Sequence, residues 1–226
     1  MIASPPAQDY LSPAAKEIVK PGMTPCQQAL ALNQKQLSTD AVKSMAHGLP
    51  EPKAVQWAAA SAEKVQNPAH ATDFQAIQAA KAWCQNPTPQ AQQLAAQAAA
   101  KAGFQTPGSW AAHAAASAGS GGAMTPHAVA GAVLLAIAQA GKPISPAGIS
   151  IPKPELPKTP EISKPDAPRF QLPFFKKPAA PTPEAPQIPT LGPDGLTLTP
   201  AQRAEMAKNT EPYLKLGCDI GNGRPT

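Results

Sequence analysis

The distribution of proline is the feature that most limits how this chain can fold. Fifteen of its thirty prolines fall between Pro143 and Pro193. Proline has no backbone amide to donate and its ring clashes with the preceding turn, so this segment cannot run as a helix or a central strand. Its spacing favours polyproline II or disorder, with a reach of about 150 Å when extended. Only residues 22–142 form a stretch that can bury the core of one domain.

Within residues 22–142, proline recurs where helices are expected to begin. The candidate starts are spaced 18, 19, 20 and 19 residues apart, at Pro50, Pro68, Pro87, Pro107 and Pro126. Proline suits the first helical turn, where its missing amide has no partner in any case, and an Asn or Thr before it can cap. Three threonines, Thr24, Thr72 and Thr199, are followed three residues later by glutamine, which is the capping-box spacing.

The apolar pattern between these starts has the period of a helix. Alanine supplies 31 of the 87 residues from Ala54 to Ala140, and apolar residues recur at i, i+3, i+4 and i+7. We therefore predict an all-α fold of short stacked helical hairpins, either solenoid-like or an irregular bundle. Because alanine is small, we expect Trp57, Trp83 and Trp110 to anchor the packing, with a tryptophan-lined ligand groove as the alternative. Asp40 is predicted at a helix start, where a carboxylate stabilises the free amides.

These signals divide the chain into four parts. Residues 1–21 are predicted to be a flexible N-terminal segment, 22–142 the helical domain and 143–198 a proline-rich arm. Residues 199–226 are predicted to hold one short helix that starts at Thr199-Pro200 and ends or bends at Pro212, followed by an irregular tail.

Charge and cysteine usage bear on partners and location. The net charge is +5, but residues 22–142 contain no arginine, which argues against a nucleic-acid partner. Cys26, Cys84 and Cys218 are odd in number and form no CxxC pair, so we expect reduced thiols in a cytoplasmic protein. No signal peptide is visible, and the most apolar segment is too short to cross a bilayer. Residues 103–141 lack charge, however, which leaves a membrane-inserting hairpin as an alternative.

A search for catalytic or metal-binding patterns favours no enzyme class. His47, His70, His113 and His127 show no metal-ligand spacing, and no nucleophile or phosphate-loop motif occurs. We therefore expect no cofactor. The arm has one distinctive cluster, which holds three of the five phenylalanines of the chain next to basic residues. Its residues are Phe170, Leu172, Phe174, Phe175, Lys176 and Lys177. Such a cluster is typical of a docking motif, either for another protein or for a groove on the helical domain itself.

Several motifs in residues 22–141 resemble an uncharacterised family of bacterial alanine-rich helical domains. They are Asp40-Ala41, AHGLP at 46–50, AVQWA at 54–58, AKAWCQNP at 80–87, SWAA at 109–112, GG at 121–122 and VAGAVLLA at 129–136. Gln56 departs from the paired tryptophan that is usual in the family. The resemblance implies no activity and no catalytic residue. Its members are found near type VI secretion genes, which implies an adaptor or accessory role.

The sequence therefore supports two functional hypotheses from different classes. The first is a non-enzymatic cytoplasmic adaptor or scaffold whose partner is a protein, such as a component or effector of secretion machinery. The second is a membrane-active or secreted accessory factor that inserts the uncharged hairpin at 103–141.

Overall fold

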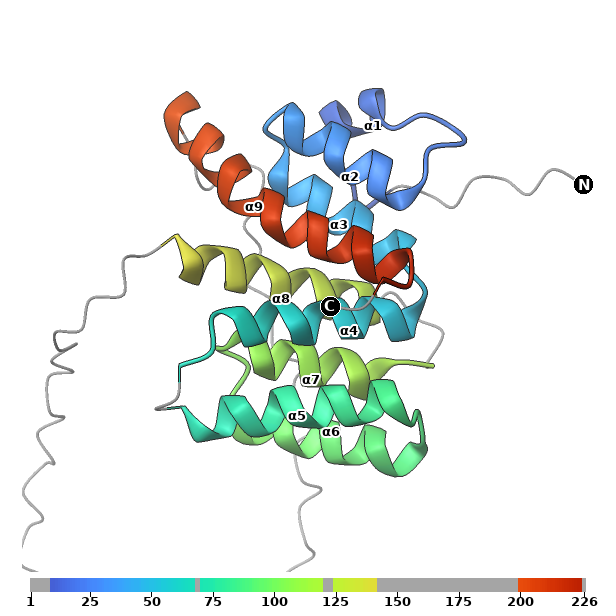
Figure 1. Cartoon of the computed structure of the whole chain (residues 1–226), viewed down its shortest axis with the longest axis vertical. Coiled ribbons are helices and arrows are strands. Elements are labelled where there is room, and N and C mark those ends of the chain that lie inside the picture. Colours follow the sequence, from blue (N-terminus) through green and yellow to red (C-terminus); the bar gives the residue numbers. More distant parts are fainter. Residues whose placement is uncertain (1–8, 68–69, 120–123, 142–198, 225–226) are drawn as a thin grey trace, which may run out of the picture. The chain divides into compact units, whose positions relative to one another are not determined.

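The computed structural model describes residues 9–67, 70–119, 124–141 and 199–224, and these residues form helices and no strands (Figure 1). The prediction of an all-α fold is confirmed. The helices are α1 (Pro13–Ile18), α2 (Pro25–Gln34), α3 (Ser38–Gly48), α4 (Glu51–Lys64), α5 (Ala71–Gln85), α6 (Pro89–Ala102), α7 (Pro107–Ser117), α8 (Met124–Ala140) and α9 (Pro200–Gly221). All of them belong to one compact unit.

Five of these helices begin with a serine or threonine that is followed directly by proline. In each, a Ser or Thr side chain accepts a hydrogen bond from the third helical amide and proline occupies the first turn, at Ser12, Thr24, Thr88, Thr106 and Thr199. The capping boxes predicted at Thr24 and Thr199 are confirmed. The one predicted at Thr72 is wrong, because α5 begins two residues earlier than that cap would place it, and His70 occupies its N-cap without a side-chain bond.

The predicted helix starts differ in accuracy. Pro107 begins α7 as expected, and Pro50 is the N-cap of α4. Helix α6 begins at Pro89 and not at Pro87, because Thr88 offers the capping hydroxyl and Asn86 instead ends α5. Capping chemistry therefore decides between two neighbouring prolines.

The helices pack as an irregular bundle. Neighbours in sequence pair from α4 through α8, as a repeat array would have them. Helix α8 also packs against α3 and α4, and α4 packs against α7 (Figure 1). In a solenoid each repeat contacts only its neighbours in sequence. Of the two arrangements that the sequence left open, these contacts fit the bundle.

Helices α4, α7 and α8 form the centre of this unit. Eight residues of α7 are buried, and its Gly108 lies so close to α5 that an added Cβ would overlap Asp73 Oδ1. The buried side of α8 carries Val129, Val133 and Ile137. Because α7 and α8 pack between neighbouring helices, much of their surface is buried. This burial accounts for the lack of charged residues noted there in the sequence. In the described part of the chain, no helix is long and apolar enough to cross a membrane.

Helix α9 differs from the short helix predicted for the C-terminus. It runs for 22 residues, passes through Pro212 without stopping, and packs against α2, α3, α4 and α8. Proline removes one helical hydrogen bond, which usually ends a helix in solvent. Here Thr210, Tyr213, Leu214 and Ile220 are buried on either side of it. Tertiary packing thus keeps the helix continuous across the proline.

Candidate functional site

Helix α9 packs into a groove formed by α2, α3, α4 and α8. Its floor is Trp57 of α4, which has no exposed surface. Gly217 of α9 faces the indole, and a Cβ added there would lie 3.0 Å from Cε2 and 3.1 Å from Nε1 of Trp57. Glycine lets the two helices approach this closely without displacing the indole.

Three side chains of the body donate hydrogen bonds to backbone carbonyls of α9. Trp57 Nε1 donates to the carbonyl of Tyr213 at 2.8 Å, and Asn33 Nδ2 donates to that of Ala207 at 2.9 Å. Lys53 Nζ donates to the carbonyl of Gly221 at 2.7 Å, in the last turn, where helical carbonyls lack partners. These bonds fix the position of α9 along its axis.

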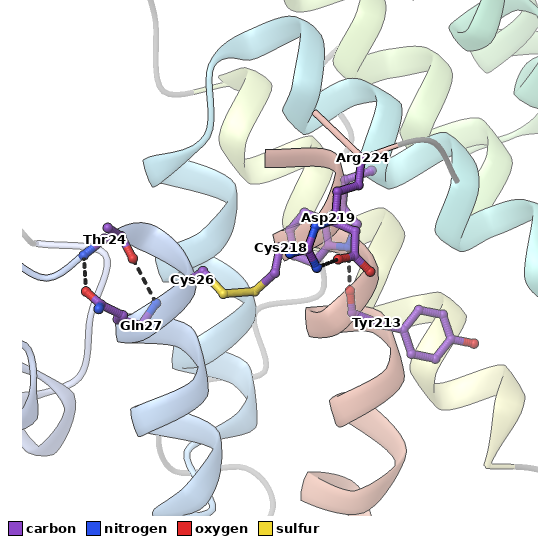
Figure 2. Close-up of a disulfide and its surroundings, with 8 residues drawn as sticks. Thr24, Cys26, Gln27, Tyr213, Cys218, Asp219 and Arg224 are labelled. Atoms are coloured by element: carbon purple, nitrogen blue, oxygen red, sulfur yellow. Dashed lines mark hydrogen bonds and ion pairs between the residues drawn. A yellow bond between two sulfur atoms is a disulfide. The ribbon is translucent and has the colours of Figure 1, made fainter. Parts of the chain in front are cut away.

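A disulfide between Cys26 and Cys218 joins α2 to α9 (Figure 2). Cys26 lies in the first turn of α2, which the Thr24–Gln27 capping box beside it holds in place. The prediction of three reduced cysteines is therefore wrong. The two cysteines are 192 residues apart, and that separation gives no local pattern from which their pairing could be inferred. Both are partly exposed.

Cys84 is the free cysteine among the described residues. It lies in α5 with its sulfur 3.6 Å from the carbonyl oxygen of Pro52. Burial raises the pKa of the Cys84 thiol to about 12. The reactive form of cysteine is the thiolate, so Cys84 is a structural thiol at neutral pH.

Asp40 and the other tryptophans have structural contacts. Asp40 is in the first turn of α3 and accepts hydrogen bonds from Ser12 N at 2.9 Å and Ser12 Oγ at 2.8 Å. The carboxylate thus holds the cap of α1 and does not bond to the amides of its own helix. Trp83 and Trp110 are 4% exposed, and the indole of Trp110 donates to the carbonyl of Phe104. The N-terminal segment, which was predicted to be flexible, is therefore helical from Pro13 to Ile18. Asp40 ties the start of this helix to α3.

Two of the four histidines meet at the end of α3. The ring of His47 stacks on Tyr10 at 3.8 Å, and the ring of His127 lies edge-on to it at 5.4 Å. Burial, His127 and Lys43 together lower the pKa of His47 to about 4. His47 is therefore neutral at physiological pH and packs as an aromatic ring. No group of three metal-ligating side chains occurs among the residues that the structure describes.

A cleft of about 520 Å³ runs between α2 and the N-terminal half of α9. Leu30 and Asn33 line it from α2, and Ala207, Lys208 and Lys215 line it from α9. The lining combines aliphatic and charged groups, and Lys215 is paired with Glu211 at 2.7 Å. The cleft is therefore a seam along the α9 interface.

The predicted docking cluster, from Phe170 to Lys177, lies outside the described residues. The structure does show where the arm is attached. Helix α8 ends at Ala140, and a Cβ added to the next residue, Gly141, would lie 3.1 Å from Nδ2 of Asn209 in α9. The described residues on either side of the arm, Gly141 and Thr199, thus belong to the same helical unit.

Sequence reasoning missed the residues that hold α9, although one signal for them exists. Tyr213, Leu214, Gly217, Cys218 and Gly221 recur at helical spacing and share one face. That stripe would have predicted a helical face that packs against the rest of the chain after Pro212. The stripe does not reveal the disulfide.

Comparison with known proteins places the body of this molecule in a family without assigning an activity. No curated protein and no solved structure matches the chain. The match to a family model covers residues 29–147, from α2 to just past the end of α8, and leaves out α9 and the arm. With just over half of its residues matched, the chain belongs to a family of unknown function, DUF6931.

Proposed function

We propose that this protein is a non-enzymatic adaptor in which the helical unit is a platform that presents the arm as a closed loop. The observation that carries the proposal is that α8 and α9, which flank the arm, are packed in one unit. Gly141 and Thr199, the described residues on either side of the arm, both belong to this unit. Binding residues are often carried on segments that a rigid scaffold presents.

The aromatic and basic cluster is placed at the middle of this loop in the sequence. Phe170 is equally far from residue 142 and residue 198, and Phe174 and Phe175 follow within one short segment. Half of the arm spans at most about 90 Å when fully extended. The middle of an arm attached at both ends therefore reaches less far than the end of a free arm. Aromatic residues, phenylalanine among them, are enriched at the buried core of protein interfaces.

The partner is a protein, and the resemblance to domains encoded near type VI secretion genes supports a component or effector of secretion machinery. A cytoplasmic location was expected from reduced cysteines, and the Cys26–Cys218 disulfide removes that basis. Disulfides persist in oxidising compartments. The proposal therefore includes function in a periplasmic or extracellular space.

The test compares partners captured from the native host by the full-length protein and by a Phe174→Ala/Phe175→Ala variant. We expect the variant to lose the specific partner, and the purified pair to bind about 10- to 30-fold more weakly. The matched control is Ile151→Ala/Ile162→Ala, which removes apolar residues of the same arm outside the cluster. Equal capture by all three proteins would contradict the proposal.

The disulfide also favours a second candidate, a secreted accessory factor. The membrane-inserting form of that hypothesis has less support, because the hairpin at 103–141 includes α7 and α8, most of whose apolar side chains are buried or partly buried in the core. Liposome flotation checks this directly. We expect the protein to stay in the lower fraction, and flotation of the protein would instead support insertion.

A further inference from the structure

Helix α9 is attached to the body unlike any other described helix. Helices α2 to α8 follow one another through short connections, whereas residues 142–198 separate α9 from α8. The domain shared with the family ends at residue 147, so the groove belongs to that domain and α9 is its occupant from outside. This is the arrangement of an amphipathic helix bound in a groove, here within one chain.

A single covalent bond holds α9 against the helices of the groove. Apart from the arm, only the Cys26–Cys218 disulfide ties α9 covalently to the body. Its two sulfur-bearing residues are partly exposed, so a reductant in solution has access to them. The remaining contacts are the buried face of α9 and the hydrogen bonds from Asn33, Lys53 and Trp57, all of which are reversible.

We propose that the Cys26–Cys218 disulfide is a redox-controlled clasp, which locks α9 into the groove when it is intact and lets α9 open independently of the rest of the bundle when it is reduced. The groove then becomes open to a helix with the pattern of α9. The clasp does not depend on the proposed adaptor function.

The chemical step requires a dithiol reductant such as a reduced oxidoreductase with a CxxC site. One thiolate of the reductant attacks the sulfur of Cys26 or Cys218, the S–S bond breaks, and the other cysteine leaves as a thiolate that takes up a proton. The second thiol of the reductant then attacks the mixed disulfide and releases the first cysteine. Two electrons and two protons pass to the protein, and the reductant is oxidised to its disulfide.

Opening of α9 would change the arm from a loop to a tail. With α9 docked, the arm is held at both ends, and with α9 released, it is held at Gly141 alone. The middle of the arm could then reach about twice as far. This consequence, unlike the clasp itself, rests on the proposed function.

The test is hydrogen exchange of the full-length protein at neutral pH, with and without dithiothreitol. In the oxidised protein we expect the amides of α9 from Tyr213 to Ile220 to exchange as slowly as those of α4 and α7. In the reduced protein we expect the α9 amides to exchange about 10-fold or more faster than those of α4 and α7. The comparison between helices within one sample separates opening of α9 from a general loss of stability.

Two variants make the experiment decisive. Cys26→Ser should behave as the reduced protein without any reductant, and Cys84→Ala should respond to dithiothreitol as the wild type does. If α9 and α7 keep a common exchange rate after reduction, α9 leaves only on global unfolding and the clasp is overturned. If Cys26→Ser does not fold, the reduced wild type alone decides. Because no partner is present, this result is independent of the capture experiment with Phe174 and Phe175.

Discussion

At the scale of single residues, this bundle depends on close approaches that small side chains allow. Alanine supplies four of the seven buried residues of α4 and four of the eight of α7, so the helix axes can come close together. The bulk of the core comes from a few large side chains, of which Trp57, Leu32 and Met45 are fully buried. Substitutions at the close approaches should therefore have large effects for small changes in volume.

Gly108 gives the sharpest case. A Cβ there would lie 2.7 Å from Cγ1 of Ile77 and 2.8 Å from the backbone carbonyl of Asp73, which cannot move aside without shifting α5. We predict that Gly108→Ala lowers the free energy of unfolding by about 2–3 kcal/mol, measured by urea denaturation. Gln97→Ala, on the exposed face of α6, is the control and should change it by less than about 0.5 kcal/mol. Equal stability of the two variants would show that α5 and α7 are farther apart than described.

Asp40 tests how the N-terminal segment is held. Asp40→Ala removes both acceptors of Ser12 and leaves the cap of α1 without its partner. We predict a loss of about 1–3 kcal/mol in the stability of this contact, seen as faster amide exchange at residues 12–19 while α7 stays protected. Unchanged exchange at these residues would mean that the apolar contacts of Leu11 and Ala15 hold α1 by themselves.

His47 makes stability depend on pH. Its pKa is lowered to about 4 in the folded protein and is near 6.5 when unfolded, so between these values the unfolded chain binds more protons. Stability is therefore complete above about pH 6.5 and falls as the pH drops toward 4. Because the ring is half-buried, solvent screening reduces the effect to about 1 kcal/mol.

Urea denaturation at pH 7.5 and pH 5 measures this dependence. The drop in stability between the two pH values should be smaller in His47→Gln than in the wild type. His70→Gln, which changes an exposed histidine, is the control and should keep the drop of the wild type. If all three proteins lose the same stability, His47 does not carry the dependence.

At the scale of helices, local sequence rules worked where local chemistry decides. The starts of α2, α7 and α9 follow from Thr-Pro steps that form caps within four residues, and these were predictable. The course of α9 through Pro212 was not, because the contacts that override the proline come from Trp57 and from α2, far away in the sequence. For the same reason the candidate site was predicted only in part, with Trp57 named as an anchor but its partner Gly217 missed.

The disulfide should contribute strongly to the stability of α9 and of the whole unit. It closes a span of 192 residues, which restricts the unfolded chain. We predict that Cys218→Ser lowers the free energy of unfolding by about 3–5 kcal/mol in the absence of reductant. Cys84→Ala should lower it by about 1 kcal/mol or less, and dithiothreitol should bring the wild type to the level of Cys218→Ser. A wild type that is insensitive to dithiothreitol would contradict this account.

At the scale of the whole molecule, the packing of α9 gives the chain its organisation. The matched family domain at 29–147 provides the groove, and α9 returns the chain to it after the arm. The proline content predicted a helical domain, an arm and a C-terminal helix. It did not indicate that the C-terminal helix packs against the helical domain. Composition shows where a chain cannot fold, but it does not show which distant segments pack together.

The most direct test of this account is a non-reducing peptide map of the full-length protein from its native host, with free thiols alkylated at lysis. The account predicts one peptide pair linked through Cys26 and Cys218, together with alkylated Cys84. Alkylation of all three cysteines even after the folded protein has been treated with a mild oxidant would contradict it, since α9 would then lack its covalent tie to α2.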